Sequence, residues 1–288
     1  MPLKIPTFAP AINLHLHQNN PRNSPTKQML KKQYPIKKPM RKYDENEFVF
    51  GLRAIIETIK SGKDIDKLLL STDADKDSEI MKELILLLRE RGIPYSRVPV
   101  QRLDKLTSKN HQGAICFVSA VNFASLDNVV AEVFEQGKVP LILVLDRITD
   151  VRNFGAIART AECAGVHAIV IPTKDAAQLN SDAMKTSAGG LNFVPVCRER
   201  NLHSAVMNLQ YMGLQVIACS EQTEKFIYQA DFTVPTVILL GSEEDGISND
   251  LMKLADMKVK IPMYGKIDSL NVSVSAGVAI YEAIRQRM

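Results

Sequence analysis

The stretch that decides the fold is residues 261–277, I-P-M-Y-G-K-I-D-S-L-N-V-S-V-S-A-G. Pro262 and Gly265 interrupt regular structure in its first half. In its second half, polar and apolar residues alternate as they do in a strand. The apolar positions nevertheless continue beyond it at helical spacing, at Leu270, Val274, Val278, Tyr281 and Ile284. We therefore predict a loop that leads into a long C-terminal helix starting near Val272.

A second unusual segment, residues 145–160, reads L-D-R-I-T-D-V-R-N-F-G-A-I-A-R-T and follows an apolar run typical of a buried strand. Asn153 belongs to the residue types that cap helices, so we expect a helix to begin beside it. Arg159 lies off the apolar stripe of that helix, and its side chain leans over Gly155 and Ala156, which leave it room. The guanidinium is therefore expected to lie toward the N-terminal end of the helix, where an anion is favoured.

A third segment, residues 237–248, reads V-I-L-L-G-S-E-E-D-G-I-S. An apolar strand is predicted to end at Gly241, where the missing side chain lets backbone approach a ligand closely. Glu243, Glu244 and Asp245 follow directly. Taken alone, these acids are more typical of a turn in front of a helix than of a site.

Strands and helices alternate along the rest of the chain. Between residues 48 and 119 we predict helices at 52–59, 77–91 and 103–108, and strands at 67–71, 95–98 and 114–119. A second run has strands predicted at 141–145, 167–171, 194–197, 214–219, 236–240 and 257–261, with helices at 155–165, 181–186, 202–212 and 249–255. This alternation indicates a mostly parallel sheet, whose ligands collect at the carboxyl ends of the strands. The sequence has neither G-x-G-x-x-G nor a P-loop pattern, so a nucleotide-like cofactor needs another mode of binding.

Charge is distributed unevenly along the chain. Residues 1–43 hold nine Lys and Arg, no Asp or Glu, and seven of the 14 prolines. The remaining residues hold 27 Lys and Arg against 32 Asp and Glu. A Pro-rich basic segment without an apolar period buries too little surface to offset the entropy of ordering it. We expect residues 1–46 to form a disordered basic arm, either a solvated tail or a non-specific contact to phosphates.

Cysteine spacing and hydropathy exclude several classes of protein. The four cysteines form no C-x-x-C or Cys/His spacing, so neither a metal site nor a disulfide framework is predicted. The longest apolar runs fall far short of the roughly 18 residues that a membrane-spanning helix needs. We expect a cytoplasmic protein with reduced thiols, no bound metal and no membrane contact.

Together the three segments resemble the three motifs of the SpoU (TrmH-like) branch of the SPOUT RNA 2′-O-ribose methyltransferases. The motifs are N-x-G-x-x-x-R at a helix start, a strand ending in G-S-E-x-x-G, and I-P-M-x-G-x-x-x-S-L-N-V-S-V. Residues 185–190, K-T-S-A-G-G, are similar to a substrate-side loop of this family. F-G-L-R-A at residues 50–54 and H-Q-G at 111–113 resemble the accessory domain of bacterial 23S rRNA guanosine 2′-O-methyltransferases. The resemblance covers residues 48–288; it departs at Val151 and Arg152, where the family often has Pro and a variable residue.

The resemblance implies an α/β fold with two domains. The C-terminal domain, expected at residues 139–288, would be an α/β trefoil-knot (SPOUT) methyltransferase. A smaller α/β, ribosomal-protein-like domain at 47–120 would bind substrate RNA. From the residue pattern alone, we expect residues 121–138 to be a linker with one helix. The implied cofactor is S-adenosyl-L-methionine. The implied partners are RNA, with 23S rRNA the first expectation, and a second copy of the chain that pairs through the C-terminal domain.

The motif match also assigns roles to individual residues. Gly241, Ile261 and Leu270 would hold the cofactor. Arg159 would meet the phosphate beside the target ribose and, in a dimer, would act on cofactor held by the other chain. The polar lining would be completed by Asn153, Glu243, Ser269 and Asn271. Because a guanidinium stays protonated at physiological pH, we assign Arg159 to activation and orientation and assign no residue as proton acceptor.

RNA contacts in the first domain are expected from its basic side chains. The candidates are Arg53, Lys60, Lys63, Arg102, Lys105, Lys109 and His111. The expected reaction is 2′-O-methylation of a guanosine ribose in 23S rRNA. A tRNA guanosine or an rRNA adenosine is the alternative target. A non-catalytic rRNA-binding assembly factor on the same fold is the alternative outside the enzymes, and the intact motif residues count against it.

Overall fold

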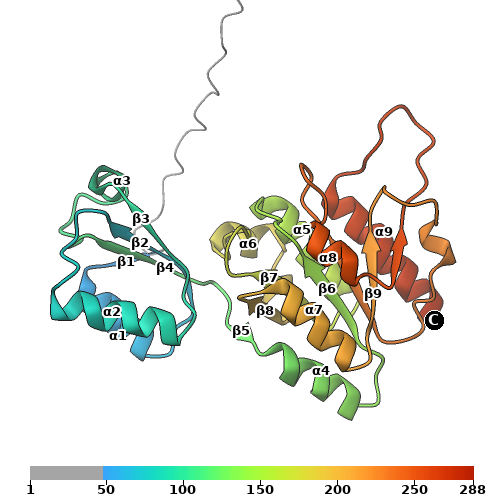
Figure 1. Ribbon diagram of the computed structural model, residues 1–288, viewed down its shortest axis with the longest axis horizontal. Helices are drawn as coiled ribbons and strands as arrows, with labels where there is room; N and C mark the ends of the chain where they lie inside the picture. Colours follow the sequence, from blue (N-terminus) through green and yellow to red (C-terminus); the bar gives the residue numbers. More distant parts are fainter. Residues whose placement is uncertain (1–47) are drawn as a thin grey trace, which may run out of the picture. The chain divides into compact units, whose positions relative to one another are not determined.

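Two β-sheets organise residues 48–288, the part of the chain that the structure, a computed structural model, describes (Figure 1). The basic arm predicted at residues 1–46 lies outside the described residues. The first sheet has the strand order β1-β4-β2-β3, and the second has the order β11-β9-β10-β6-β7-β8-β5.

The first sheet is mixed and carries helices on both faces. Its elements are β1 (Phe48–Phe50), α1 (Leu52–Lys60), β2 (Ile65–Ser71), α2 (Glu79–Glu90), β3 (Tyr95–Val98), α3 (Val100–Asp104) and β4 (Ala114–Val118). Strands β2 and β3 are parallel, whereas β4 runs antiparallel to both β1 and β2. Leu68 and Leu70 face the helices α1 and α2, while Leu69 packs with Leu103 of α3 on the other face. The helix expected at 103–108 lies earlier in the chain, at Val100–Asp104, and begins directly after Pro99.

The second sheet is parallel throughout. Its strands are β5 (Phe123–Ala124), β6 (Leu141–Leu145), β7 (Ala168–Pro172), β8 (Val196–Glu199), β9 (Gln215–Cys219), β10 (Thr236–Leu240) and β11 (Met257–Val259). The central strands β6 and β10 are buried at every residue. Their unbroken apolar runs fit a sheet that is covered on both faces.

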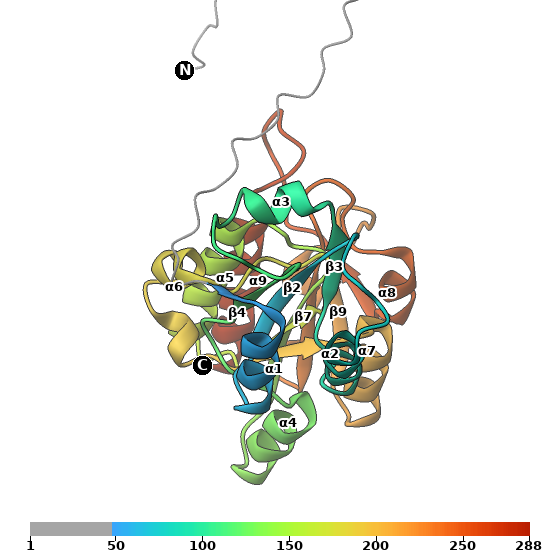
Figure 2. The same ribbon diagram turned by 90° about the vertical axis from the view of Figure 1, so that its left-hand side faces the viewer.

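Two helical layers cover this sheet. Its helices are α4 (Leu126–Glu135), α5 (Val151–Cys163), α6 (Ser181–Thr186), α7 (Leu202–Tyr211), α8 (Asn249–Leu254) and α9 (Val272–Arg287), with short 3₁₀ turns at Gly190–Asn192 and Ile227–Gln229. Helices α5, α6 and α9 lie on one side and α7 and α8 on the other (Figure 2). Side chains of β6 alternate between the two layers: Leu143 packs with the α5 layer, and Ile142 and Val144 pack with the α7 layer.

Residues 121–138, expected to be a linker with one helix, contain that helix as α4 and also the strand β5. Phe123 and Ala124 of β5 pair with β8 at the edge of the second sheet. Leu126 and Val130 of α4 are buried in the same cluster as Ile142 of β6. A two-residue strand leaves no periodicity in the sequence, so this attachment to the second sheet was not predictable from pattern alone.

Candidate active site

A cleft of about 600 Å³ opens at the carboxyl ends of the adjacent strands β9, β10 and β11. Six of the eight predicted site residues line it: Gly241, Glu243, Ile261, Ser269, Leu270 and Asn271. The two others, Asn153 and Arg159, lie on α5 outside the lining. The rule that ligands bind at strand ends of parallel sheets therefore located the cleft correctly.

Gly241 ends β10 at a point where the chain folds back on itself. A Cβ added to Gly241 would lie 2.1 Å from the carbonyl carbon of Gly246 and 2.2 Å from the backbone nitrogen of Ile247. The space beside Gly241 is therefore filled by the backbone of its own loop, and not by an approaching ligand as the sequence argument assumed. A side chain at this position would displace residues 242–247, which form the wall of the cleft.

Glu243 joins the three sequence motifs at one oxygen atom. Its Oε1 accepts hydrogen bonds from Asn271 Nδ2 at 2.6 Å and from Asn153 Nδ2 at 3.0 Å. Asn271 Nδ2 also donates to Asn153 Oδ1 at 3.0 Å. The loop after β10 is thereby tied to the N-terminal ends of α5 and α9, although these residues lie up to 118 positions apart in the sequence.

Helix α5 begins earlier than expected. Its cap is Asp150, whose Oδ1 accepts hydrogen bonds from the backbone nitrogens of Arg152 and Asn153 at 2.7 and 3.0 Å. The prediction that Asn153 is the cap was wrong, because Asp150 satisfies the free backbone donors of the first turn. The amide side chain of Asn153 is left free to bond Glu243 and Asn271.

Helix α9 begins at the predicted residue, and Asn271 is its cap. Asn271 Oδ1 accepts hydrogen bonds from the backbone nitrogen and the hydroxyl of Ser273 at 3.0 and 2.5 Å. With Oδ1 directed into its own helix, Nδ2 is available to Glu243. Ser269 and Leu270 precede this cap in the exposed loop that borders the cleft.

Arg159 lies on the exposed side of α5, and within residues 48–288 no hydrogen bond or ion pair of its guanidinium is found. The open surface expected at Gly155 is absent: an added Cβ there would lie 1.9 Å from Thr186 Oγ1 of α6. A Cβ on Gly190 would lie 3.3 Å from the Cα of Arg159. The segment 185–190, which resembles a substrate-side loop, therefore packs directly against the part of α5 that carries Arg159.

Sequence reasoning missed the contribution of β9 to the cleft. Cys219, Ser220, Glu221 and Gln222, at and after the end of β9, line the cleft. Burial raises the pKa of the Cys219 thiol to about 12, so this side chain is a neutral, apolar part of the wall. The strand-end rule would have found these residues, but no unusual residue pattern drew attention to them.

The composition of the cleft fits S-adenosylmethionine. Apolar side chains from three segments, Leu240, Val259 with Ile261, and Leu270, offer surface for a flat heterocycle. Glu243, Glu244 and Asp245 on the loop after β10 add negative charge, which suits a cofactor with a positively charged sulfonium. The volume lies within the usual range for small-molecule sites.

Comparisons with known proteins agree with this assignment. Residues 140–281 match the SpoU rRNA Methylase family, and residues 48–124 match the family described as RNA 2′-O ribose methyltransferase substrate binding. The putative TrmH family tRNA/rRNA methyltransferase YacO of Bacillus subtilis is 33% identical over 84% of this chain and 97% of its own length. The 23S rRNA (guanosine-2′-O-)-methyltransferase RlmB of Vibrio parahaemolyticus is also 33% identical, over 84% of this chain and 98% of its own length.

A solved structure supports both the fold and the cofactor. The SpoU methyltransferase AviRb from Streptomyces viridochromogenes, in complex with AdoMet, is similar with a TM-score of 0.53 and 26% identity, over 83% of this chain and 90% of that one. The expected fold class, a SPOUT methyltransferase domain preceded by an RNA-binding domain, and the expected cofactor are thereby confirmed. The chain belongs to the SpoU (TrmH-like) family of S-adenosylmethionine-dependent RNA 2′-O-methyltransferases.

Proposed function

We propose that this chain methylates the 2′-hydroxyl of a guanosine ribose in 23S rRNA and acts as a homodimer. The observation that carries the catalytic part is the Asn153–Glu243–Asn271 cluster, which unites all three motifs at the edge of the cleft. The rRNA target is supported by the substrate-binding domain at residues 48–124 and by the RlmB relative, whose length is covered almost completely.

The cleft residues divide into two groups by their chemistry. Ile261 and Leu270 provide apolar contact for the adenine, and the backbone around Gly241 forms the adjoining wall. When bound, S-adenosylmethionine supplies an electrophilic methyl group on a positively charged sulfur. Glu243, held by two amide side chains, places a carboxylate at the cleft, and Ser269 and Asn271 complete its polar border. Fixed geometry of this kind contributes to the rate by aligning the reacting groups before reaction.

Arg159 contacts the phosphate beside the target ribose and orients the nucleotide. Its exposed position next to the segment 185–190 fits a role at the RNA and not at the cofactor. A guanidinium binds phosphate with two parallel hydrogen bonds, which fixes orientation as well as position.

A dimer through the layer of α5 and α9 brings Arg159 to the cleft of the partner. Helix α9 packs beside α5, since a Cβ on Gly277 would lie 3.9 Å from Thr160 Cγ2. The outer side of α9 exposes two large apolar side chains, Val274 and Tyr281, which are 50% and 52% exposed. Apolar residues that repeat along one exposed helix face favour burial against another copy.

The basic side chains of the first domain divide into paired and open ones. Lys60 forms an ion pair with Glu83 at 2.7 Å. His111 is buried, and its ring bonds Asp104 and the backbone nitrogen of Gly113, which gives it a structural role. The exposed Arg53, Lys63, Arg102 and Lys105 remain as candidates for phosphate contacts.

The experiment is a methyl-transfer assay with the full chain, S-adenosylmethionine and either unmodified large-subunit rRNA or unmodified tRNA. We expect one ribose methylation in the rRNA, mapped by the resistance of the adjacent phosphodiester to alkaline cleavage. No labelled methyl group should be transferred from S-adenosylmethionine when the target nucleotide is 2′-deoxyguanosine. Methylation of tRNA alone, or of an rRNA adenosine, would overturn the proposed target and favour the alternative enzymes. RNA binding without cofactor binding or transfer would favour the assembly factor.

A further inference from the structure

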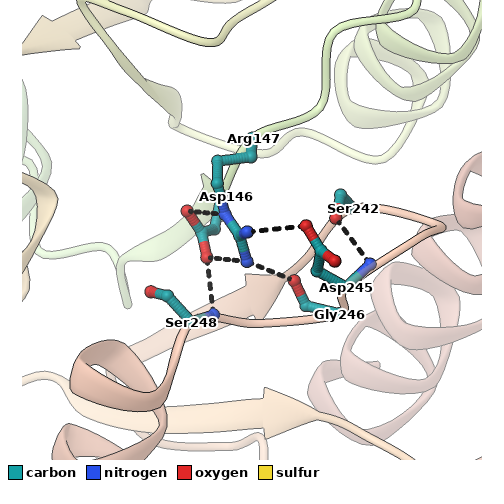
Figure 3. A network of polar contacts seen from close by, with 6 residues as sticks. All are labelled: Asp146, Arg147, Ser242, Asp245, Gly246 and Ser248. Carbon is teal, nitrogen blue, oxygen red and sulfur yellow. Dashed lines mark hydrogen bonds and ion pairs between the residues drawn. The ribbon is translucent and has the colours of Figure 1, made fainter.

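A buried carboxylate and a partly buried arginine at the end of β6 hold the acidic loop that follows β10 (Figure 3). Asp146 extends the ladder between β6 and β10, because its backbone nitrogen donates to Leu240 O at 2.8 Å. Its side chain is only 7% exposed, and Oδ2 accepts a hydrogen bond from the backbone nitrogen of Ser248 at 2.7 Å. Neither Asp146 nor Arg147 lines the cleft.

Arg147 spans the gap from Asp146 to the far side of the loop. Its Nε lies 3.3 Å from Asp146 Oδ1. Nη1 donates to Asp245 Oδ2 and Nη2 donates to the carbonyl oxygen of Gly246, both at 3.0 Å. One planar guanidinium therefore fixes two successive residues of the loop against the end of a buried strand.

The backbone of Arg147 is held in an uncommon conformation to make these contacts. Its φ of 58° lies in the left-handed region, which residues other than glycine rarely adopt. Such a conformation persists only where surrounding contacts stabilise it. The four hydrogen bonds of the guanidinium, two to Asp146 and one each to Asp245 and Gly246, provide that stabilisation.

The loop itself is closed at its base and presents Glu243 from its tip. Ser242 and Gly246 exchange two backbone hydrogen bonds, at 3.2 and 3.0 Å. Asp245 N donates to Ser242 Oγ at 3.1 Å. The hydrogen bonds between Ser242 and Gly246 close the turn, and Arg147 anchors one side of it. Together they fix the direction in which the Glu243 side chain points.

We propose that Asp146 and Arg147 are positioning residues for the cofactor site. They fix the loop 242–246 so that Glu243 can bond Asn153 and Asn271 and so that the loop backbone forms the wall of the cleft. This inference rests on the proposed role of Glu243 in the site. Arg147 lies outside the lining of the cleft and acts through the loop.

The test uses the full chain and the substitution Arg147→Gly. Glycine accepts the left-handed backbone without strain, so the variant removes the side chain and preserves the turn. Asp175, with a φ of 57° in the loop after β7, supplies a matched control, Asp175→Gly, which makes the same kind of backbone change outside the cleft. Arg147→Lys is the second variant, because lysine keeps the charge but cannot span Asp146, Asp245 and Gly246 together.

We expect Arg147→Gly to raise the calorimetric Kd for S-adenosylmethionine about tenfold, a loss of the size of one hydrogen bond to a charged group. In the absence of cofactor, amide hydrogen exchange of residues 242–248 should accelerate, while that of β6 and β10 stays slow. Arg147→Lys should recover only part of the affinity. In a Glu243→Ala background the added effect of Arg147→Gly should shrink, because both substitutions act through one loop.

Several results would overturn the inference. An unchanged Kd in Arg147→Gly refutes it whether or not exchange accelerates, and so does an equal loss in Asp175→Gly. Full additivity with Glu243→Ala would show that Arg147 acts by another route. Failure of the unsubstituted chain to bind S-adenosylmethionine would instead refute the proposed function, which keeps the two failures distinct.

Discussion

Replacing Arg159 by alanine is expected to separate cofactor binding from methyl transfer. Arg159 lies six positions after Asn153 on α5, a rise of about 9 Å along the helix. Arg159 is exposed and lies outside the lining of the cleft. We therefore expect Arg159→Ala to change the free energy of unfolding by less than about 0.5 kcal/mol and the Kd for S-adenosylmethionine by less than about twofold.

The rate of transfer should respond very differently. A charge-assisted contact that orients the reacting nucleotide is worth about 3 kcal/mol in the transition state, which corresponds to a loss of more than a hundredfold in kcat. The kcat of Arg159→Lys should lie between those of Arg159→Ala and the unsubstituted chain, because lysine supplies a charge without the bidentate geometry. The rate is measured with saturating cofactor on an rRNA fragment, and the Kd by titration calorimetry on the same samples.

Arg152 provides the control on the same helix. It is exposed in the first turn of α5, and Arg152→Ala removes an equal charge from another exposed position of the same helix. We expect this variant to retain near-normal turnover. Near-normal turnover in Arg159→Ala would refute the reasoning, since Arg159 would then be a solvated surface charge. An equal loss of turnover in Arg152→Ala would mean that methyl transfer depends on the total positive charge of the helix surface and not on the position of Arg159.

The sequence located the elements that are buried on both faces most accurately. Strands β6 and β10 were predicted to the residue, because their apolar runs, Leu141–Leu145 and Val237–Leu240, end sharply at Asp146 and Gly241. The start of α5 was misplaced by four residues, since both Asp150 and Asn153 are capping types and propensity does not choose between them. In the structure the backbone nitrogens of Arg152 and Asn153 bond the carboxylate of Asp150, which makes Asp150 the cap.

The candidate site was predictable as a set of loops but not as a set of bonds. That Gly241, Ile261 and Leu270 share one cleft follows from the neighbouring positions of β9, β10 and β11 in the sheet. The contacts of Arg147 require the strand order as well, because β6 and β10 are adjacent in the sheet although Arg147 and Asp245 are 98 residues apart. No local periodicity carries that information, which explains why Asp146 and Arg147 were missed.

Three further substitutions test other parts of the structure. Gly241→Ala should lower the free energy of unfolding by about 2 kcal/mol and weaken cofactor binding, because the new Cβ meets the backbone of Gly246. Denaturation with and without cofactor measures both effects. An unchanged melting curve would contradict the close contact between Gly241 and the backbone of its loop. Burial, with the positive charge of Arg287 nearby, lowers the pKa of His167 in the folded state. The neutral His167 therefore contributes its full stabilisation above about pH 6.5, the ordinary pKa of histidine, and this stabilisation is lost as the pH falls toward the lower pKa of the folded state. In urea titrations His167→Gln should therefore reduce the slope of unfolding free energy against pH between 7 and 5 by up to about 1.4 kcal/mol per unit. Finally, Val274→Glu places a charge on the exposed apolar side of α9, where pairing with a second copy would bury it without a partner. Sedimentation should then report a monomer that still binds cofactor but has lost methyl transfer, because Arg159 could no longer reach the cleft of the partner. Val234→Glu, at a similarly exposed valine elsewhere, should remain dimeric and active, whereas an active Val274→Glu monomer would place Arg159 in the site of its own chain.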